Sequence, residues 1–190
     1  MEAQGYSCGA VGEVARLAGK TPVYIGVVGA AQCSDRLAET AAAVGQEIAQ
    51  RGGVVVCGGR GGVMAAAARG AAAAGGVVLG ILPEDDRAGA NPHLTYSIPT
   101  GLGQARNVIV VLASDALVAV GGGFGTLSEI ASALKLGVPV VGLDSWGFSP
   151  PVDAPPLAVG AYARASTPAE AVEIAWRAAA ARTPSRPPYD

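Results

Sequence analysis

The stretch ALVAVGGGFGTLSEIASALKL, residues 116–136, decides the fold. Its first five residues are all apolar, which predicts a buried strand, and residues 126–136 have the composition of a helix. The glycine cluster 121–125 lies between them and predicts a tight turn from strand to helix. A strand that is apolar on both faces is typical of a parallel sheet covered by helices on both sides.

The same alternation of short apolar runs and helical segments repeats along the chain. Strands are predicted at 23–28, 54–57, 77–82, 95–98, 116–120 and 138–143, and helices at 35–51, 62–74, 101–112, 126–136 and 168–181. Right-handed crossovers join such units into a doubly wound sheet. We therefore predict an α/β fold, a three-layer, doubly wound, Rossmann-like parallel sheet in a single domain. This nucleotide- or phosphate-binding domain is expected at 21–182, between an N-terminal arm at 1–20 and a loose proline-rich tail at 183–190.

The composition argues against several classes of function. The net charge is −2 and there is no basic run, so nucleic-acid binding is not expected. Cys8, Cys33 and Cys57 lack metal-type spacing, and their odd number argues against a disulfide framework. No strongly apolar run reaches the roughly 20 residues of a membrane span. The N-terminus lacks the pattern of a signal peptide, so a cytoplasmic protein is expected.

Two glycine clusters, at 58–62 and 121–125, each lie between a predicted strand and a predicted helix. The carboxyl ends of parallel strands meet at one edge of the sheet, where ligands bind. Free backbone N–H groups and a helix N-terminus favour a phosphate there. The residues expected to bind a phosphate or nucleotide are Gly58, Gly59, Arg60, Gly122, Gly123, Gly125 and Thr126. In the alternative interpretation, the glycines serve only turns that need a positive φ.

The common nucleotide-binding motifs are absent from this sequence. The lysines, Lys20 and Lys135, stand outside any G-x-x-x-x-G-K-[ST] pattern, and no G-x-G-x-x-G follows a strand. Neither a Walker-type NTPase nor a standard NAD site is therefore expected. No lysine is placed to form the Schiff base of a pyridoxal-phosphate decarboxylase.

Arg106, the pair Ser114-Asp115 and the run GGFGTLSE at 122–129 resemble the signature of the "lonely guy" (LOG) family. The resemblance covers about residues 23–143. Members of that family are phosphoribohydrolases that release the base from cytokinin riboside 5′-monophosphates and often from AMP, and many relatives carry the label "lysine decarboxylase". The family pattern has proline where this chain has Gly121, glutamate at Ser128 and a basic residue at Asn107. Residues 58–64 and 101–107 look closer to a sister branch similar to molybdenum-cofactor carrier proteins.

The resemblance implies hydrolysis of the N-glycosidic bond in AMP or a cytokinin-riboside-type monophosphate, yielding base and ribose 5-phosphate. Such a reaction passes through an oxocarbenium-like transition state and needs a carboxylate near the sugar and an activated water. The catalytic residues are then Glu129, acting on the ribose at C1′, and Arg106, neutralising phosphate or developing charge. In the alternative interpretation Glu129 only stabilises its helix dipole and Arg106 forms a surface ion pair.

The substitution at Ser128 leaves a second function open, a non-catalytic carrier or sensor of a phosphorylated cofactor such as molybdopterin. If the chain is an enzyme, Asp85 and Asp86 are candidates for a second carboxylate, although such acidic loops are more often solvated. No metal ion and no cofactor are expected to be required, beyond a bound nucleotide monophosphate or phosphate. The helices at 62–74 and 126–136 carry little charge, which predicts a homodimer or a larger homo-oligomer.

Overall fold

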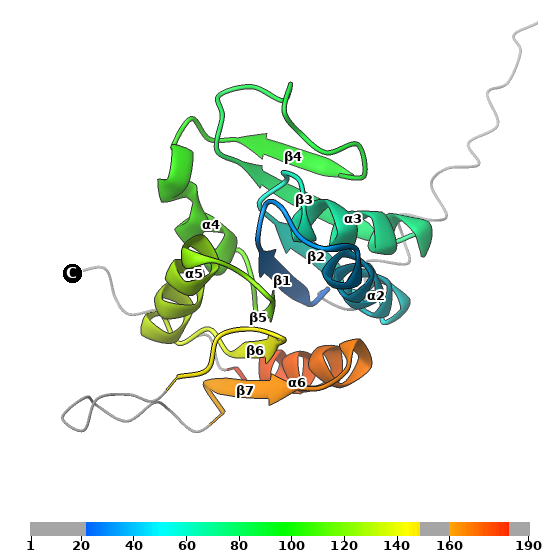
Figure 1. Ribbon diagram of the computed structural model, residues 1–190, viewed down its shortest axis with the longest axis vertical. Helices are drawn as coiled ribbons and strands as arrows, with labels where there is room; N and C mark the ends of the chain where they lie inside the picture. The colour runs from blue at the N-terminus through cyan, green and yellow to red at the C-terminus, as the bar shows by residue number, and fades with distance from the viewer. Residues whose placement is uncertain (1–21, 149–159, 183–190) are drawn as a thin grey trace, which may run out of the picture.

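The computed structural model describes residues 22–148 and 160–182, and within them seven strands form one parallel sheet (Figure 1). The strands are β1 (Tyr24–Gly29), β2 (Val54–Cys57), β3 (Val77–Leu82), β4 (Tyr96–Pro99), β5 (Ala116–Val120), β6 (Val140–Leu143) and β7 (Tyr162–Ala165). Their order is β4-β3-β2-β1-β5-β6-β7, and every neighbouring pair is parallel. The chain therefore winds outward from β1 to β4 and then crosses back to β5. The topological switch point lies between β1 and β5.

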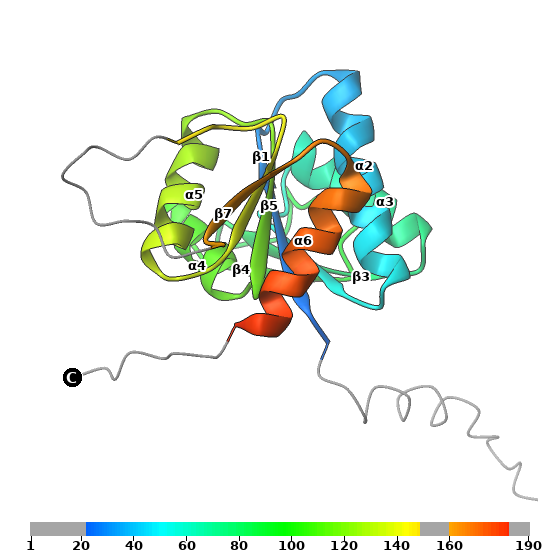
Figure 2. The same cartoon turned by 90° about the horizontal axis from the view of Figure 1, so that it is seen from below.

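Helices cover both faces of the sheet (Figure 2). They are α2 (Asp35–Gln50), α3 (Val63–Ala73), the 3₁₀ helix η2 (Gly103–Arg106), α4 (Asn107–Leu112), α5 (Phe124–Lys135) and α6 (Pro168–Ala181). α2, α3 and α6 pack on the face that carries Ile25 and Val27, whereas α4 and α5 pack on the face that carries Val28 and Leu117. The central strands are thus buried on both sides, as their continuous apolar runs predict. The predicted fold class is confirmed.

Local sequence signals set the helix boundaries. The Ser34 hydroxyl accepts a hydrogen bond from the Leu37 backbone N–H at 3.4 Å and caps α2. Thr167 accepts from the Glu170 N–H at 3.2 Å, with Pro168 in the first turn of α6. α2 and α3 approach closely at two glycines: a Cβ at Gly45 would lie 2.0 Å from the Ala67 carbonyl oxygen, and one at Gly70 would lie 1.9 Å from that of Ala42. The low charge of α3 is therefore explained by its packing against α2.

Three elements differ from the prediction. The expected helix at 101–112 is observed as η2 and α4, and its start is displaced, because the φ values of Gly101 and Gly103, +64° and +55°, lie outside the helical region. α5 begins at Phe124, two residues before the predicted start at Thr126. The edge strand β7 was not predicted, since its four residues YARA give almost no hydrophobic signal. The expected arm and tail lie outside the described residues, so the domain limits stay predictions.

Candidate functional site

A cavity of about 600 Å³ opens at the carboxyl edge of the sheet, beside the switch point between β1 and β5. Its walls come from the loop after β1, the turn after β2 with the start of α3, the segment after β3, η2 with α4, and the start of α5. The lining residues are Gly29, Ala30, Ala31, Arg60, Met64, Pro83, Glu84, Gly103, Gln104, Arg106, Asn107, Gly123, Gly125, Thr126 and Glu129. This volume suits a mononucleotide-sized ligand, because small-molecule sites span about 300–1,000 Å³.

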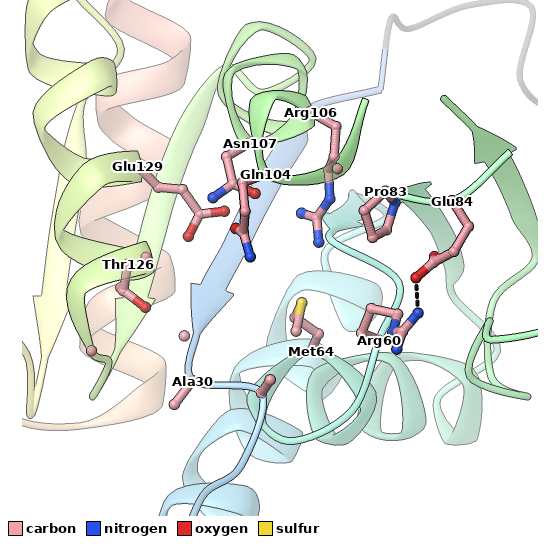
Figure 3. Close-up of a pocket in the computed structure, with 15 residues that line it drawn as sticks. Ala30, Arg60, Met64, Pro83, Glu84, Gln104, Arg106, Asn107, Thr126 and Glu129 are labelled. Carbon is pink, nitrogen blue, oxygen red and sulfur yellow. Dashed lines mark hydrogen bonds and ion pairs between the residues drawn. The ribbon is translucent and has the colours of Figure 1, made fainter. Parts of the chain in front are cut away.

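Arg106 ends η2, and its guanidinium extends into the cavity (Figure 3). The residue is 7% exposed, forms no ion pair with another described residue, and its buried Nε has no hydrogen-bond partner. The guanidinium lies against Gly58, where an added Cβ would be 2.3 Å from Nη1. Burial lowers the pKa of Arg106, while the charge of Glu129 acts in the opposite direction. Since arginine stays protonated in proteins, the cavity contains a buried, unpaired positive charge.

Glu129 lies in the second turn of α5 and faces the same cavity from the opposite side (Figure 3). It is also 7% exposed and forms no ion pair with another described residue. Burial raises the pKa of this carboxyl to about 7, and the positive charge of Arg106 offsets only part of that effect. A carboxyl with a pKa near neutral can both accept and release a proton at physiological pH.

The N-terminus of α5 points its first turn at the cavity through Gly123, Gly125 and the buried Thr126. No side chain caps this end, so its first backbone N–H groups are free to bind an anion. Gly122 has a φ of +113°, and a Cβ there would lie 2.5 Å from Thr126 Cβ, so both the backbone and the close packing require glycine.

Two hydrogen bonds hold the turn before α5, one to the last residue of β6 and one from the segment that follows β6. The Ser145 hydroxyl donates a hydrogen bond to the Gly121 carbonyl oxygen at 2.5 Å, and the Gly121 N–H donates to the Leu143 carbonyl oxygen at 3.0 Å. These two contacts fix the glycine turn in one conformation. Ser145 was not singled out from the sequence, because nothing in its neighbourhood marks it as a contact of residue 121.

Arg60 and Glu84 form an ion pair on the cavity wall opposite α5 (Figure 3). The sequence pointed to Arg60 and, for a second carboxylate, to Asp85 and Asp86. Both aspartates are exposed and do not line the cavity, whereas Glu84 does. The signal for Glu84 was its position: it follows Pro83 at the carboxyl end of β3, on the edge where ligands bind.

Gln104, Asn107 and Met64 also line the cavity, and sequence reasoning did not single them out as ligand contacts. The side-chain amides of Gln104 and Asn107 lie two residues before and one residue after Arg106 in the sequence. Their nearness to the predicted catalytic arginine was the signal that could have identified them. Both amides can donate and accept hydrogen bonds, whereas the Met64 thioether presents an apolar, polarizable surface.

The remaining candidates take different places. Gly58, Gly59 and Gly122 lie beside the cavity without lining it, so their direct contact with a phosphate stays a prediction. Within 22–148 and 160–182, no group of His, Cys, Asp and Glu has the arrangement of a metal site. Cys57 is buried, and burial raises the pKa of its thiol to about 11. None of the helices described is long and apolar enough to cross a membrane.

Comparison with known proteins identifies related chains. The model of the SLOG cluster4 family matches residues 22–172. An uncharacterized protein of Archaeoglobus fulgidus is 45% identical over 150 residues, which cover 79% of this chain and 92% of that protein.

Two solved structures share both fold and sequence with this chain. The molybdenum cofactor binding protein from the phototrophic bacterium Rippkaea orientalis is 35% identical, with a TM-score of 0.73 over 83% of this chain and 97% of that one. The molybdenum cofactor carrier protein of Chlamydomonas reinhardtii is 35% identical, with a TM-score of 0.71 over 83% of this chain and 99% of that one.

Proposed function

Since the chain belongs to the SLOG cluster4 family, we propose that it is a phosphoribohydrolase that cleaves nucleoside 5′-monophosphates to base and ribose 5-phosphate. The resemblance to the LOG family, and to its branch of molybdenum-cofactor carriers, is confirmed by the family match and by the two structures described above. One observation carries the proposal: a buried carboxyl, Glu129, faces a buried and unpaired guanidinium, Arg106, across a cavity that also receives a helix N-terminus.

The phosphate of the substrate binds at the start of α5. The free N–H groups of the first turn donate to its oxygens, and the Thr126 hydroxyl lies on the same wall. Arg106 adds a positive charge from the other side of the cavity. The ribose then lies between this end and Glu129, within the space that the cavity provides.

Hydrolysis breaks the bond between C1′ and the base nitrogen, and the bonding electron pair leaves with the base. A water oxygen forms the new bond to C1′ while the Glu129 carboxylate takes the water proton and stabilises the positive charge on the ribose. The departing base nitrogen takes up a proton, so one water is consumed in the net reaction. The raised pKa of Glu129, about 7, is suited to this transfer.

The substitution at Ser128 does not remove a carboxylate from the cavity wall. Ser128 is exposed on α5 and does not line the cavity, whereas Glu129 is buried in it. The second carboxylate on the wall belongs to Glu84, from a different part of the chain. The departure from the family pattern at residue 128 is therefore compatible with chemistry at Glu129.

Incubation with AMP, GMP, IMP, CMP, UMP and a cytokinin riboside monophosphate tests the proposal, with free base and ribose 5-phosphate as the readout. We expect base release from at least one of them, reduced by about 10²-fold or more in Glu129→Gln, since general acid–base groups contribute about 10²- to 10⁴-fold. Glu39→Gln, which removes an exposed carboxyl of α2, is the matched control. Base release that is equal in wild type and Glu129→Gln would contradict the catalytic role of Glu129.

A carrier of a phosphorylated cofactor is the second candidate. The observation that favours it is that two proteins 35% identical over nearly their whole length are described as binding or carrying the molybdenum cofactor. In that role the same α5 turn and Arg106 hold the cofactor phosphate, and Glu129 performs no chemistry. Calorimetry with molybdopterin and with nucleoside monophosphates separates the two: micromolar binding without turnover supports the carrier, and turnover of a bound nucleotide excludes it.

We further propose that two copies of the chain associate through α4 and α5. Val108, Leu112 and Leu136 expose large apolar surface there, and Lys135 is the only charged residue of these two described helices outside the cavity. Such a surface is typical of an interface. Light scattering is expected to give at least a dimer, and Leu112→Asp a monomer; a monomeric wild type at micromolar concentration contradicts the assignment.

A cytoplasmic location, the absence of a cofactor requirement and the absence of nucleic-acid binding stay predictions.

A further inference from the structure

The ion pair of Arg60 and Glu84 occupies the cavity wall farthest from Thr126 and Glu129 (Figure 3). The phosphate-binding end proposed above does not use it. The side chains are 41% and 34% exposed, so both can meet a ligand that fills the cavity. Because Glu84 neutralises Arg60, this wall is a poor second site for a phosphate.

The pair is held in place from several sides. The Glu84 carbonyl oxygen accepts hydrogen bonds from the N–H groups of Thr100 and Gly101 at 2.9 and 2.8 Å. The Asn91 backbone N–H donates to the Gly59 carbonyl oxygen at 3.0 Å. The Asn91 side-chain amide donates to the backbone carbonyl oxygen of Arg60 at 3.3 Å. The loop that carries Glu84 and the turn that carries Arg60 are thus tied to each other, which orients the two side chains before a ligand arrives.

The hydrogen-bonding capacity of Glu84 is only half used. Its Oε1 accepts from Arg60 Nη1, whereas its Oε2 is buried and has no partner among the described residues. An unsatisfied buried carboxylate oxygen is costly, so such an atom calls for a donor. The last torsion of a glutamate side chain is broad, which lets the carboxylate turn both oxygens toward a bound group while Arg60 stays paired. The wall then presents one donor from Arg60 followed by two acceptors from Glu84.

We propose that Arg60 and Glu84 bind the heterocycle of the ligand, and that they select a ring with a lactam–amidine edge. That edge, found in guanine and in pterins, offers a carbonyl oxygen, a ring N–H and an exocyclic amino group in a row. The carbonyl accepts from Arg60, and the two N–H groups donate to the two oxygens of Glu84. This inference rests on the proposed function in one respect, because the phosphate of the same ligand is taken to lie at the start of α5.

Adenine fits this wall less well. Its edge offers an amino donor and a ring-nitrogen acceptor, and the third position is a carbon, so one oxygen of Glu84 stays without a partner. Hypoxanthine keeps the carbonyl and the ring N–H but lacks the amino group. A site that contains buried polar groups discriminates strongly against a ligand that leaves one of them unpaired. GMP is therefore expected to bind better than IMP and better than AMP.

Titration calorimetry on full-length Glu129→Gln protein tests the inference without turnover, with GMP, IMP, AMP and 6-hydroxymethylpterin monophosphate as probes. We expect the affinity for GMP to exceed that for IMP by about tenfold or more, because one hydrogen bond to a charged group contributes at least that factor. Adding Glu84→Gln should bring the ratio of the GMP and IMP affinities to within about threefold, because the amide offers only one acceptor oxygen. Adding Asp85→Asn, the same change at an exposed neighbour that does not line the cavity, should leave the ratio intact.

Equal binding of AMP and GMP, or a GMP preference that survives Glu84→Gln in a protein that melts normally, overturns the assignment. If no probe binds, this inference fails, whereas the proposed function fails only if wild type also releases no base from any of the monophosphates named above. If the preference depends on Glu84 but wild type releases no base, only the hydrolase fails and the heterocycle site stands. Tighter binding of the pterin probe than of GMP, equally dependent on Glu84, identifies a pterin as the ligand; the reverse order identifies a guanine nucleotide.

Discussion

Arg106 and Glu129 face the same cavity, each with 7% of its surface exposed, and no ion pair joins them. A direct contact would satisfy both charges and close the space between them. Their separation has an electrostatic consequence: the guanidinium compensates only part of the desolvation of the carboxyl, and the pKa of Glu129 stays raised at about 7. An occupant between the two residues would therefore meet a positive charge on one side and a proton acceptor on the other.

The rate of base release is expected to depend on pH through Glu129. The carboxylate form accepts the water proton, so kcat should rise as the pH increases through about 7, the pKa of this carboxyl. Measurement of kcat at saturating substrate between pH 5.5 and 8.5 checks this, because kcat reports groups in the enzyme–substrate complex. A rate that falls over this range would show that the protonated form of Glu129 is the active one.

The same carboxyl should make the stability depend on pH. Its pKa is raised from 4.5 to about 7 in the folded protein, so the folded state holds the proton more tightly. The resulting stabilisation is fully present below about pH 4.5 and is lost as the pH rises through about 7, with an upper limit of about 3 kcal/mol. Glu129→Gln cannot lose a proton, so its free energy of unfolding relative to wild type should increase from pH 5 to pH 8. Urea unfolding at the two pH values measures this, with Glu39→Gln as the control; a difference that does not change with pH contradicts it.

Gly58→Ala is expected to impair the site through Arg106. A Cβ at this position would lie 2.3 to 2.7 Å from the guanidinium nitrogens and carbon, so the arginine must move. We expect base release to fall by about 10²-fold, the cost typical of a lost charge-stabilising group. Gly61→Ala in the same turn is the matched control, because its nearest neighbour, the Ala31 carbonyl oxygen, is 3.3 Å away. Equal activities of the two variants would show that Arg106 has room to adjust.

The fold was predictable from the sequence because its signals are local. Apolar runs such as 116–120 and 77–82 mark buried parallel strands, and both match observed elements. The edge strand β7 has no such signal, since its pairing with β6 is made by the backbone and depends on distant sequence. The displaced start of the helix expected at 101–112 depends on the φ values of Gly101 and Gly103, which the apolar pattern does not reveal.

The residues of the candidate site were predictable where a sequence motif contains them. Glu129, Arg106 and the α5 turn were found from the glycine run and the upstream arginine, and the structure brings them to one cavity. Glu84 was missed in favour of its neighbours Asp85 and Asp86, because which of three consecutive acidic residues turns inward depends on the conformation after β3. The role of Gly58 in making room for Arg106 was equally hidden, since it depends on a contact between residues 48 positions apart.

Ser145→Ala should loosen the turn before α5. The hydroxyl of Ser145 donates to the Gly121 carbonyl oxygen at 2.5 Å, and its loss removes one of the two contacts that hold Gly121. We expect the free energy of unfolding to fall by about 1 kcal/mol, and ligand affinity to fall by about 3- to 10-fold, since one hydrogen bond is worth about 1 kcal/mol. Ser132→Ala, on α5 but away from the cavity, is the control. Because Ser145 only positions the turn, KM should increase while the dependence of kcat on pH stays unchanged. A shift of that pH dependence would instead mean that Ser145 acts on Glu129.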